Sequence, residues 1–441
     1  MGIVRVYCED VMSEVLRVGV AGLGTVGAET VRLLRLRRED LARRAGRPIE
    51  LVAVSARDRS KDRGVDLAGV AWEDDAVALA RRDDVDLVCE LIGGSEGPAR
   101  TLVETALSAG KSVVTANKAL LAHHGTALAK TAEAGGVTLA YEAAVAGGIP
   151  IIRALRQGLV ANSIGRVYGI LNGTCNYILS AMRDTGRAFD DVLAEAQELG
   201  YAEADPSFDV DGIDAAHKLS LLAALVFGRE VDFDGVHIEG IRPISPLDIA
   251  YAEEFGFRIK LLGIAEEAPE GVRQRVHPCM VRKDAPIAQV EGVFNAVVAE
   301  GDAVGTTLFL GRGAGAGPTA SAVIGDIVDV AAGRRAPVFG IAAAELRAAR
   351  PAPMEALEGR YYVRLMVIDR PGVLADVTAI LRDEHVSMES MLQQGRDPME
   401  KVPVALTTHE VDEASMRRAL DKIARLDAVL EPPAMIRIVE L

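Results

Sequence analysis

The first third of the chain alternates short apolar runs with amphipathic stretches. Residues 16–21, "LRVGVA", form a β-rich run, and further apolar runs follow at "IELVAVSA", "VDLVCELIGG", "KSVVTANK" and "VTLAYEAAV". Helical patterns separate these runs, for example over 98–109 and 118–134. Strands that alternate with helices at this spacing indicate βαβ units and a mostly parallel sheet. The pattern predicts a first α/β domain over residues 16–145.

The pattern changes after residue 146. Helices are predicted at 147–160, 174–184, 189–199 and 212–227, and strands at 166–171, 258–265, 272–281, 290–298 and 306–310. Long alternating strands such as "VRQRVHPCMV" are typical of an antiparallel sheet with one face packed on helices. We therefore expect an α+β domain over 146–350, followed by the proline-punctuated linker "RPAPMEALEGR".

The last part of the chain predicts a third, smaller domain over 360–437. The strand "YYVRLMVID" precedes the helix "VLADVTAILRDEH", two strands follow at "VSMESMLQQG" and "VPVALTTH", and "DEASMRRALDKIARL" and "AMIRIVEL" form a last helix and strand. The order β-α-β-β-α-β is that of a ferredoxin-like domain.

Composition and charge restrict the function. A chain of 441 residues with a net charge of −15 disfavours nucleic acid and anionic membrane surfaces as partners, because both require a basic surface. The four cysteines, Cys8, Cys89, Cys175 and Cys279, are widely spaced, which favours a reducing cytoplasm over a disulfide framework or a zinc site. No apolar run reaches about 18 residues, and "MGIVRVYCEDVMSEV" lacks the features of a secretory signal. Met12 is an alternative start.

A glycine-rich loop joins the first strand to the first helix. In "GLGTVG", Gly22 would make a tight turn, Gly24 would let the backbone approach a pyrophosphate, and Gly27 would allow close helix packing. The intervening Leu23, Thr25 and Val26 would supply backbone N–H groups at the helix start. This context predicts a Rossmann-type nucleotide site, with a purely structural turn as the alternative.

The end of the second strand bears on the choice of nucleotide. "VAVSARDRSKDRG" places Ser55, Arg57, Arg59 and Lys61 where a 2′-phosphate would lie. The segment favours NADP(H) over NAD(H), although the arginines would also suit an exposed charged loop.

Acidic residues surround a lysine at the start of an apolar helix. In "DVDGIDAAHKLSLLAAL", helical periodicity places Asp214 beside Lys218, and Asp209, Asp211, Asp205 and Glu203 lie just upstream. A surface ion pair is the ordinary explanation. The apolar flanks favour instead a partly buried lysine that donates a proton or anchors a substrate.

Two further segments carry candidate chemistry. Lys118, in "TANKALL", follows a strand of the parallel sheet, where ligands bind, although it could also be an ordinary helix-start lysine. Asn172, Gly173 and Thr174 precede a helix whose N–H groups could bind a carboxylate or phosphate. Cys175 is a rival nucleophile, but no nearby histidine would activate it.

These motifs, taken in order, resemble homoserine dehydrogenase over residues 16–350. The resemblance rests on "GLGTVG", "ELIGG", "TANKALL", "YEAAVAGGIPII", "LNGTCNYIL", "GYAEADPSFDVDGIDAAHKL" and "GRGAGAGPTASAV". The segment "VIDRPGVLADVTAIL" resembles an ACT domain, an amino-acid-sensing module. The resemblance implies reversible reduction of L-aspartate 4-semialdehyde to L-homoserine with NADPH or NADH, on the route to threonine, methionine and isoleucine.

The resemblance also implies roles for individual residues. Lys218 matches the family's proton donor, and Asp214 matches the carboxylic acid beside it. Lys118 stays open as an alternative proton donor. Glu203 matches the acid that holds the substrate's amino group, near Asp209. The motifs "ELIGG" and "GRGAGAGPTASAV" extend the expected nucleotide site to Gly93, Ser95, Gly313 and Gly315. The "EAAVAGGI" stretch resembles a monovalent, sodium-like cation site formed mainly by backbone carbonyls of Glu142, Val145, Gly147 and Ile149.

The ACT resemblance implies feedback control, with threonine as the expected effector and the turn Asp369–Gly372 as its carboxylate site. Such domains pair, so we expect a homodimer or homotetramer, and the tail could also serve oligomerisation alone. Two other functions stay open. A phosphorylating semialdehyde dehydrogenase would use Cys175, whereas a non-catalytic NADP-sensing regulator would transfer no hydride.

Overall fold

The computed structural model describes residues 14–393 and 401–441, which form two compact units. The first contains the chain up to Ile164 together with 220–233 and 300–349, and the second contains 165–219, 234–299 and 350–441. Cys8, Met12 and most of the opening segment lie outside the described residues, as does the end of the predicted strand "VSMESMLQQG".

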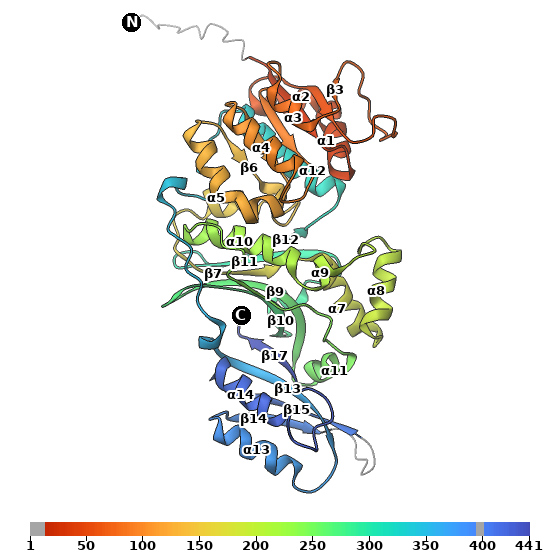
Figure 1. The fold of residues 1–441 in the computed structure, drawn as a ribbon, viewed down its shortest axis with the longest axis vertical. Coiled ribbons are helices and arrows are strands. Elements are labelled where there is room, and N and C mark those ends of the chain that lie inside the picture. The colour runs from red at the N-terminus through yellow and green to blue at the C-terminus, as the bar shows by residue number, and fades with distance from the viewer. Residues whose placement is uncertain (1–13, 394–400) are drawn as a thin grey trace, which may run out of the picture. The chain divides into compact units, whose positions relative to one another are not determined.

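The first unit is built on a six-stranded sheet in the order β3-β2-β1-β4-β5-β6. Figure 1 labels its two edge strands, β3 and β6. Every pairing in it is parallel, which confirms the α/β prediction. The strands are β1 (Leu16–Ala21), β2 (Ile49–Ser55), β3 (Ala71–Glu73), β4 (Leu87–Glu90), β5 (Ser112–Thr115) and β6 (Leu139–Ala140). Its main helices are α1 (Thr25–Leu36), α2 (Arg38–Ala45), α3 (Ala76–Arg81), α4 (Pro98–Ser108) and α5 (Lys118–Ala134).

A helix from far along the chain completes this unit. Apolar side chains of α12 (Ala316–Ala331), including Val323 and Ile327, belong to the same hydrophobic core as Val18 of β1 and Val31 of α1. The unit also contains η1 (Glu142–Ala144), α6 (Ile151–Arg153), η2 (Ala154–Gly158), β12 (Gly305–Arg312) and η4 (Ala343–Glu345).

The helix predicted over 147–160 is shorter than expected. It begins only after Pro150, because "AGGIP" forms a turn.

The second unit is built on a mixed sheet in the order β11-β7-β9-β10-β17-β13-β15-β14. Its strands are β7 (Ile164–Ile170), β9 (Phe257–Ala268), β10 (Gly271–Arg282), β11 (Phe294–Gly301), β13 (Glu358–Ile368), β14 (Met388–Gln393), β15 (Lys401–Thr408) and β17 (Ala434–Val439). Short strands β8 (Val236–Ile238) and β16 (Val411–Asp412) pair with β10 and β13. The strand predicted over 290–298 begins later, after η3 (Pro286–Gln289).

The C-terminal part of this unit has the predicted β-α-β-β-α-β order. Helices α13 (Val373–Asp383) and α14 (Glu413–Ile423) cover one face of β13, β15 and β14 (Figure 1), and their apolar side chains share one core with those strands. The closing strand β17 pairs with β13 on one side and with β10 on the other. The strands of the ferredoxin-like part therefore form one continuous sheet with β10 and β9.

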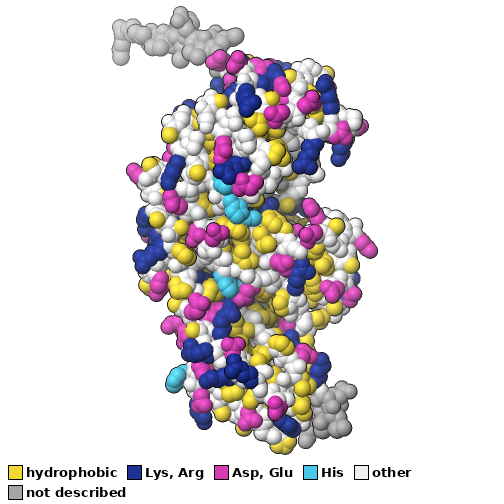
Figure 2. Space-filling view, viewed as in Figure 1, with side chains coloured by type: hydrophobic (Ala, Val, Ile, Leu, Met, Phe, Trp, Pro, Cys, Tyr) yellow, Lys and Arg dark blue, Asp and Glu magenta, His cyan; other side chains and the backbone are white. Residues whose placement is uncertain are grey.

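The remaining helices of this unit are α7 (Gly173–Thr185), α8 (Phe189–Glu198), α9 (Ser207–Val210) and α11 (Pro246–Glu254). Helix α10 (Ile213–Phe227) begins in this unit, and its residues from Ser220 onward belong to the first. Basic and acidic side chains are interspersed on the face shown in Figure 2. Within residues 14–393 and 401–441, every helix is too short or too polar to cross a membrane. Cys89, Cys175 and Cys279 are buried free thiols.

Candidate functional site

The glycine loop has the shape that a dinucleotide requires. Gly22 has φ +93°, and a Cβ on it would lie 2.4 Å from the Leu91 carbonyl oxygen. A Cβ on Gly27 would lie 1.8 Å from the Gly22 carbonyl oxygen, so only glycine allows α1 to begin here. Gly24 faces open space, and as N-cap of α1 it leaves the first N–H groups of Thr25 and Val26 without a side-chain cap. The residues present therefore fit a pyrophosphate.

A residue outside the predicted set braces this loop. Arg63 donates from Nε to the Leu23 carbonyl at 3.2 Å, lies over the Trp72 ring at 5.5 Å, and also contacts the Asp58 carbonyl. Arg57 is exposed at the end of β2, and Ser55 is buried. Arg63 thus holds the charged segment against the glycine loop, a contact that no local pattern indicates.

Glu90, at the end of β4, fixes the "ELIGG" loop. Its carboxylate is fully buried and accepts from the N–H groups of Ile92 (2.8 Å) and Gly93 (3.0 Å) and from the Thr115 hydroxyl (2.6 Å). This pinning lets the backbone turn through Gly93 and Gly94, both with positive φ, before Ser95. The predicted nucleotide contacts Gly93 and Ser95 therefore depend on a buried acid that the sequence argument missed.

Asn117 links the same loop to the helix that carries Lys118. Its Nδ2 donates to the Gly94 carbonyl at 2.7 Å, and its Oδ1 accepts from Leu120 N at 3.0 Å as the N-cap of α5. Lys118 is the half-buried first residue of α5. The two predicted segments of the first unit, "ELIGG" and "TANKALL", are thus held together.

The predicted acid–lysine pair is a buried cluster rather than a surface pair. Lys218 Nζ donates to Asp214 Oδ2 and to the Leu171 carbonyl oxygen, each at 2.7 Å. The side chains of Lys218 and Asp214 are 9% and 6% exposed, so water screens their attraction weakly. Asn295 Nδ2 also donates to the Leu171 carbonyl, at 3.0 Å. The Lys218 ammonium is therefore held by two acceptors that lie far apart in the sequence, the Leu171 carbonyl and the Asp214 carboxylate.

Asn172 joins this pair to a second carboxylate. Its Nδ2 donates to Asp209 Oδ1 and Asp214 Oδ2, each at 2.8 Å, so its two N–H bonds bridge the two carboxylates. Its Oδ1 accepts from Cys175 N at 2.8 Å and caps α7. We call Lys218, Asp214, Asn172, Asp209 and the Leu171 carbonyl the acid–lysine cluster. It combines a buried ammonium with hydrogen-bonded carboxylates.

The acid–lysine cluster and the glycine loop lie in a chain that is similar to named proteins over most of its length. A homoserine dehydrogenase model matches residues 150–328, its NAD-binding domain model matches 22–142, and an ACT domain model matches 361–428. Homoserine dehydrogenase of Pseudomonas aeruginosa is 46% identical over 433 residues, which is 97% of this chain and 99% of the relative. The chain belongs to the homoserine dehydrogenase family.

Solved structures of the family agree with the fold. A homoserine dehydrogenase from Thiobacillus denitrificans has a TM-score of 0.91 at 48% identity, with 97% of this chain and 99% of that chain covered. A hyperthermophilic archaeal homoserine dehydrogenase in complex with NADPH has a TM-score of 0.63 at 25% identity, with 74% and 100% covered. The chain carries the family's NAD-binding domain and a C-terminal ACT domain.

The stretch expected to bind a cation is a tight turn in the first unit. Gly147 has φ +49°, and a Cβ on it would lie 2.3 Å from the Gly313 carbonyl oxygen, so the loops "AGGIP" and "GRGAGAG" require glycine where they meet. Two expected carbonyl ligands accept backbone hydrogen bonds, Glu142 from Val145 N at 3.4 Å and Ile149 from Ile151 N at 2.8 Å. Each carbonyl keeps a second lone pair, so the turn fits a cation held by backbone oxygens.

The Glu142 side chain has a different task. Its carboxylate accepts from Ile152 N at 2.8 Å and Arg153 N at 2.9 Å and so begins α6. Its own N–H donates to Asp326 Oδ2 at 2.9 Å. Burial raises the pKa of Glu142, and burial together with the Glu142 charge raises the pKa of Asp326 to about 7. Glu142 therefore anchors the turn to α12.

The remaining predicted substrate residues lie around α7. Thr174 donates from its hydroxyl to the Tyr201 carbonyl at 2.7 Å, and Gly173 begins α7 beside the Val293 carbonyl oxygen. Glu203 is exposed in the loop before α9, and its carboxylate has no partner among the described residues. Its contact with the cluster is therefore not formed. Gly315 has φ +117° and caps α12.

Cys175 does not have the environment of a nucleophile. The thiol is fully buried and donates to the Asp209 carbonyl at 3.2 Å. Burial and the charges of Asp209 and Asp214 raise the pKa of Cys175 well above its ordinary value. A protonated, inaccessible thiol disfavours the phosphorylating semialdehyde dehydrogenase.

Proposed function

We propose that this chain is a homoserine dehydrogenase that reversibly reduces L-aspartate 4-semialdehyde to L-homoserine with NADPH or NADH. The observation that carries the proposal is the acid–lysine cluster, in which Lys218 donates 2.7 Å hydrogen bonds to Asp214 and the Leu171 carbonyl inside a chain of this family. The bound nicotinamide supplies or accepts the hydride. The acid–lysine cluster would donate a proton to the substrate oxygen and accept it again in the reverse direction.

Lys218 is the proposed proton donor. An ammonium has three N–H bonds, and the hydrogen bonds to Asp214 and Leu171 use two of them. The third is left for the aldehyde oxygen of the substrate, which gains negative charge as its carbon is reduced. Lys218 stabilises that charge and gives up the proton, and it accepts the hydroxyl proton in the reverse direction. Lys118 is the alternative acid.

Neighbouring residues position the donor and the substrate. Asp214 orients the Lys218 ammonium through a 2.7 Å hydrogen bond, and Asn172 holds Asp214 and Asp209 in place by donating to both. In our proposal Glu203 binds the substrate's amino group together with Asp209. Gly173 and Thr174 present the N-terminus of α7 to the carboxylate.

The nucleotide is proposed to bind along Gly22, Leu23, Gly24, Thr25, Val26 and Gly27, with Gly93, Ser95, Lys118, Gly313 and Gly315 completing the site. Arg57 would contact a 2′-phosphate, which favours NADP(H) over NAD(H). A monovalent, sodium-like cation is proposed on the carbonyls of Glu142, Val145, Gly147 and Ile149.

Further proposals concern the cellular role. The reaction belongs to the synthesis of threonine, methionine and isoleucine in the cytoplasm, and threonine is the proposed effector of the ACT domain, in a homodimer or homotetramer. We also propose the functional division into a nucleotide-binding domain (16–145), a substrate-binding and dimerisation domain (146–350) and a regulatory domain (360–437).

One assay tests the proposed activity. Oxidation of NADPH, followed by absorbance, is measured with aspartate semialdehyde, with and without threonine, and NADH replaces NADPH in parallel. Turnover that requires the semialdehyde and proceeds without phosphate supports the proposal. Absence of turnover with both nucleotides would refute it.

A further inference from the structure

A buried asparagine of β11, Asn295, contacts the acid–lysine cluster from outside it. Asn295 is 2% exposed, and its Nδ2 donates to the Leu171 carbonyl oxygen at 3.0 Å. The same oxygen accepts from Lys218 Nζ at 2.7 Å. A carbonyl oxygen has two lone pairs, so these two donors together saturate it. Asn295 and the proposed proton donor therefore share one acceptor.

The start of β11 packs against the end of β7 and the turn that follows it. The two strands are neighbours in the sheet of the second unit. A Cβ on Gly169 of β7 would lie 2.3 Å from the Ala296 carbonyl oxygen. A Cβ on Gly173, where α7 begins, would lie 2.7 Å from the Val293 carbonyl oxygen. Both positions require glycine, because the backbone on either side of Asn295 approaches them so closely.

A second buried amide holds the loop that leads into Asn295. Asn176 of α7 is 1% exposed, and its Nδ2 donates to three main-chain carbonyls. These belong to Val290 at 3.1 Å, Gly292 at 2.9 Å and Phe294 at 3.3 Å. The contacts fix the main chain up to the residue before Asn295, and they use no member of the acid–lysine cluster. The position of Asn295 is therefore set independently of the cluster.

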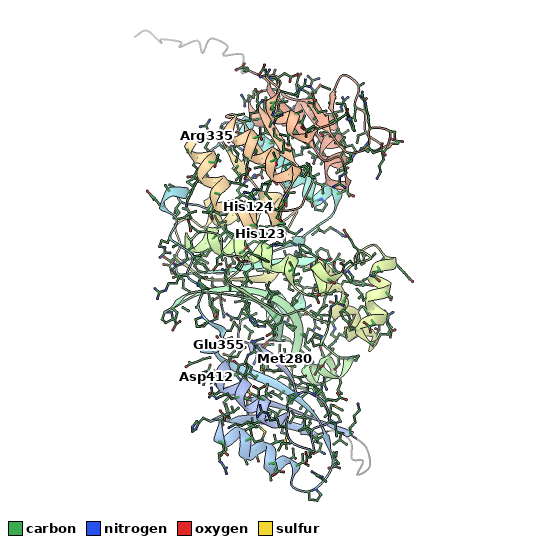
Figure 3. All side chains as sticks on the ribbon, in the orientation of Figure 1. His123, His124, Met280, Arg335, Glu355 and Asp412 are labelled. Carbon is green, nitrogen blue, oxygen red and sulfur yellow. The ribbon has the colours of Figure 1, made fainter. Side chains whose placement is uncertain are left out.

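A buried lysine completes this support. Lys260 of β9 pairs with Cys279, the residue before Met280, which Figure 3 labels. Lys260 is 2% exposed, and its Nζ donates to the Val290 carbonyl at 2.6 Å and to Asn176 Oδ1 at 3.1 Å. The loop is thus held by an ammonium and an amide that are both buried. Satisfied buried polar contacts of this kind make a structure rigid.

We propose that Asn295 is a positioning residue for Lys218 and acts through the Leu171 carbonyl. The inference rests on the proposed function, which assigns proton donation to Lys218. Asn295 occupies one lone pair of the Leu171 oxygen from a fixed direction and so orients the other lone pair towards the ammonium. The ammonium is held in one orientation. Proton donation requires this, because a general acid must lie within hydrogen-bond reach of the atom that it protonates.

Two properties of the contact favour positioning over simple satisfaction of a buried carbonyl. The Leu171 oxygen already has a partner in Lys218, so a second donor is not needed to avoid an unpaired buried acceptor. The second donor is also a neutral amide. It adds no positive charge beside the ammonium and therefore does not oppose the protonated form of Lys218.

The test compares Asn295→Ala with Thr408→Val in the full chain. Thr408 is a matched control, because it is fully buried in the same unit and its Oγ1 accepts from Tyr361 N at 3.0 Å. Asn295→Ala should lower kcat for semialdehyde reduction about tenfold, the equivalent of one hydrogen bond. Its KM for the semialdehyde and its NADPH affinity should stay at the wild-type level. Thr408→Val should lower the melting temperature but keep kcat.

Asn295→Ser is a second variant that keeps a polar side chain at this position. Its hydroxyl is one atom shorter than the amide and does not span the gap to the Leu171 oxygen. Asn295→Ser should therefore show the same loss of kcat as Asn295→Ala, and it carries the test if the alanine variant does not fold.

A double-mutant cycle separates positioning of Lys218 from general damage. If Asn295 acts through Lys218, adding Asn295→Ala to Lys218→Ala should cause no further loss of kcat. Additive losses, wild-type kcat in folded Asn295→Ala, or an equal loss of kcat in Thr408→Val would each overturn the proposal. A wild type that does not reduce the semialdehyde refutes the proposed function instead, so the two failures are distinguishable.

Discussion

Asp214→Asn isolates the contribution of the carboxylate to proton transfer. The substitution keeps the shape of the side chain but removes the negative charge 2.7 Å from Lys218 Nζ, in a site where both side chains are below 10% exposure. Removing one partner of a buried ion pair costs about 3–5 kcal/mol. Asp214 also fixes the position of the Lys218 ammonium, and a positioned general acid contributes about 10²–10⁴-fold to a rate.

The expected result is a loss of kcat in both directions. Lys218 loses the acceptor that orients its ammonium, so proton transfer to the reduced semialdehyde should slow by about 10²-fold or more. Oxidation of homoserine passes through the same proton transfer in reverse and should slow as well. The assay is kcat in both directions, with circular dichroism to establish folding.

Asp211→Asn is the matched control. Asp211 lies in the same loop but pairs with Arg242 at the surface, with 40% of its side chain exposed. Such pairs contribute about 0–1 kcal/mol, and Asp211 does not touch Lys218. The kcat of Asp211→Asn should match that of the wild type. A wild-type kcat in folded Asp214→Asn would refute the assigned role of Asp214.

Three further predictions concern the nucleotide loop, the ACT domain and Glu90. Gly27→Ala should lower the melting temperature and abolish NADPH binding, because its Cβ would lie 1.8 Å from the Gly22 carbonyl oxygen. Gly24→Ala has open space around its Cβ, so it should keep the melting temperature but weaken NADPH binding in fluorescence titration. Wild-type NADPH affinity in Gly24→Ala would contradict the assigned pyrophosphate contact. Burial opposes ionisation of Glu413, but the Arg437 guanidinium more than offsets it and holds the pKa of Glu413 below 4.5. A carboxyl whose pKa is lower in the folded protein than in the unfolded chain stabilises the fold at pH values above its unfolded pKa. Glu413→Gln should therefore lower the free energy of unfolding in urea by about 3–5 kcal/mol at pH 7, and this loss should shrink as the pH falls below 4.5. A loss that does not change with pH would contradict the prediction. Glu90→Gln places an amide against the N–H groups of Ile92 and Gly93 and should cost about 1–3 kcal/mol of stability. It should also raise KM for the nucleotide. An unchanged KM would show that nucleotide binding does not depend on this loop.

Local periodicity predicted most of the elements but not their long-range contacts, and it missed the short strand β3 (Ala71–Glu73). The parallel sheet and the β-α-β-β-α-β order follow from runs of 4 to 12 residues, whose side-chain spacing reflects burial directly. The packing of α12 with β1, and the pairing of β17 with β10, join residues more than 150 positions apart. Nothing in either segment alone encodes its partner.

The candidate site was predictable to a similar degree. Spacing placed Lys218 beside Asp214, since helical neighbours four residues apart share a face. It did not indicate that Asn172 would bridge Asp214 and Asp209, because that contact depends on how α7 meets the loop before α10. Glu90 was missed since an acid at the end of an apolar strand gives no periodic signal. These residues act through tertiary contacts.

The most direct measurement compares wild type and Lys218→Ala in NADPH-dependent reduction of aspartate semialdehyde, with NADPH affinity titrated on the same preparations and Lys118→Ala measured beside them. The account predicts that Lys218→Ala loses about 10²–10⁴-fold in kcat while its NADPH affinity is unchanged. Near-normal turnover in Lys218→Ala, or a larger loss in kcat for Lys118→Ala at unchanged NADPH affinity, would contradict it.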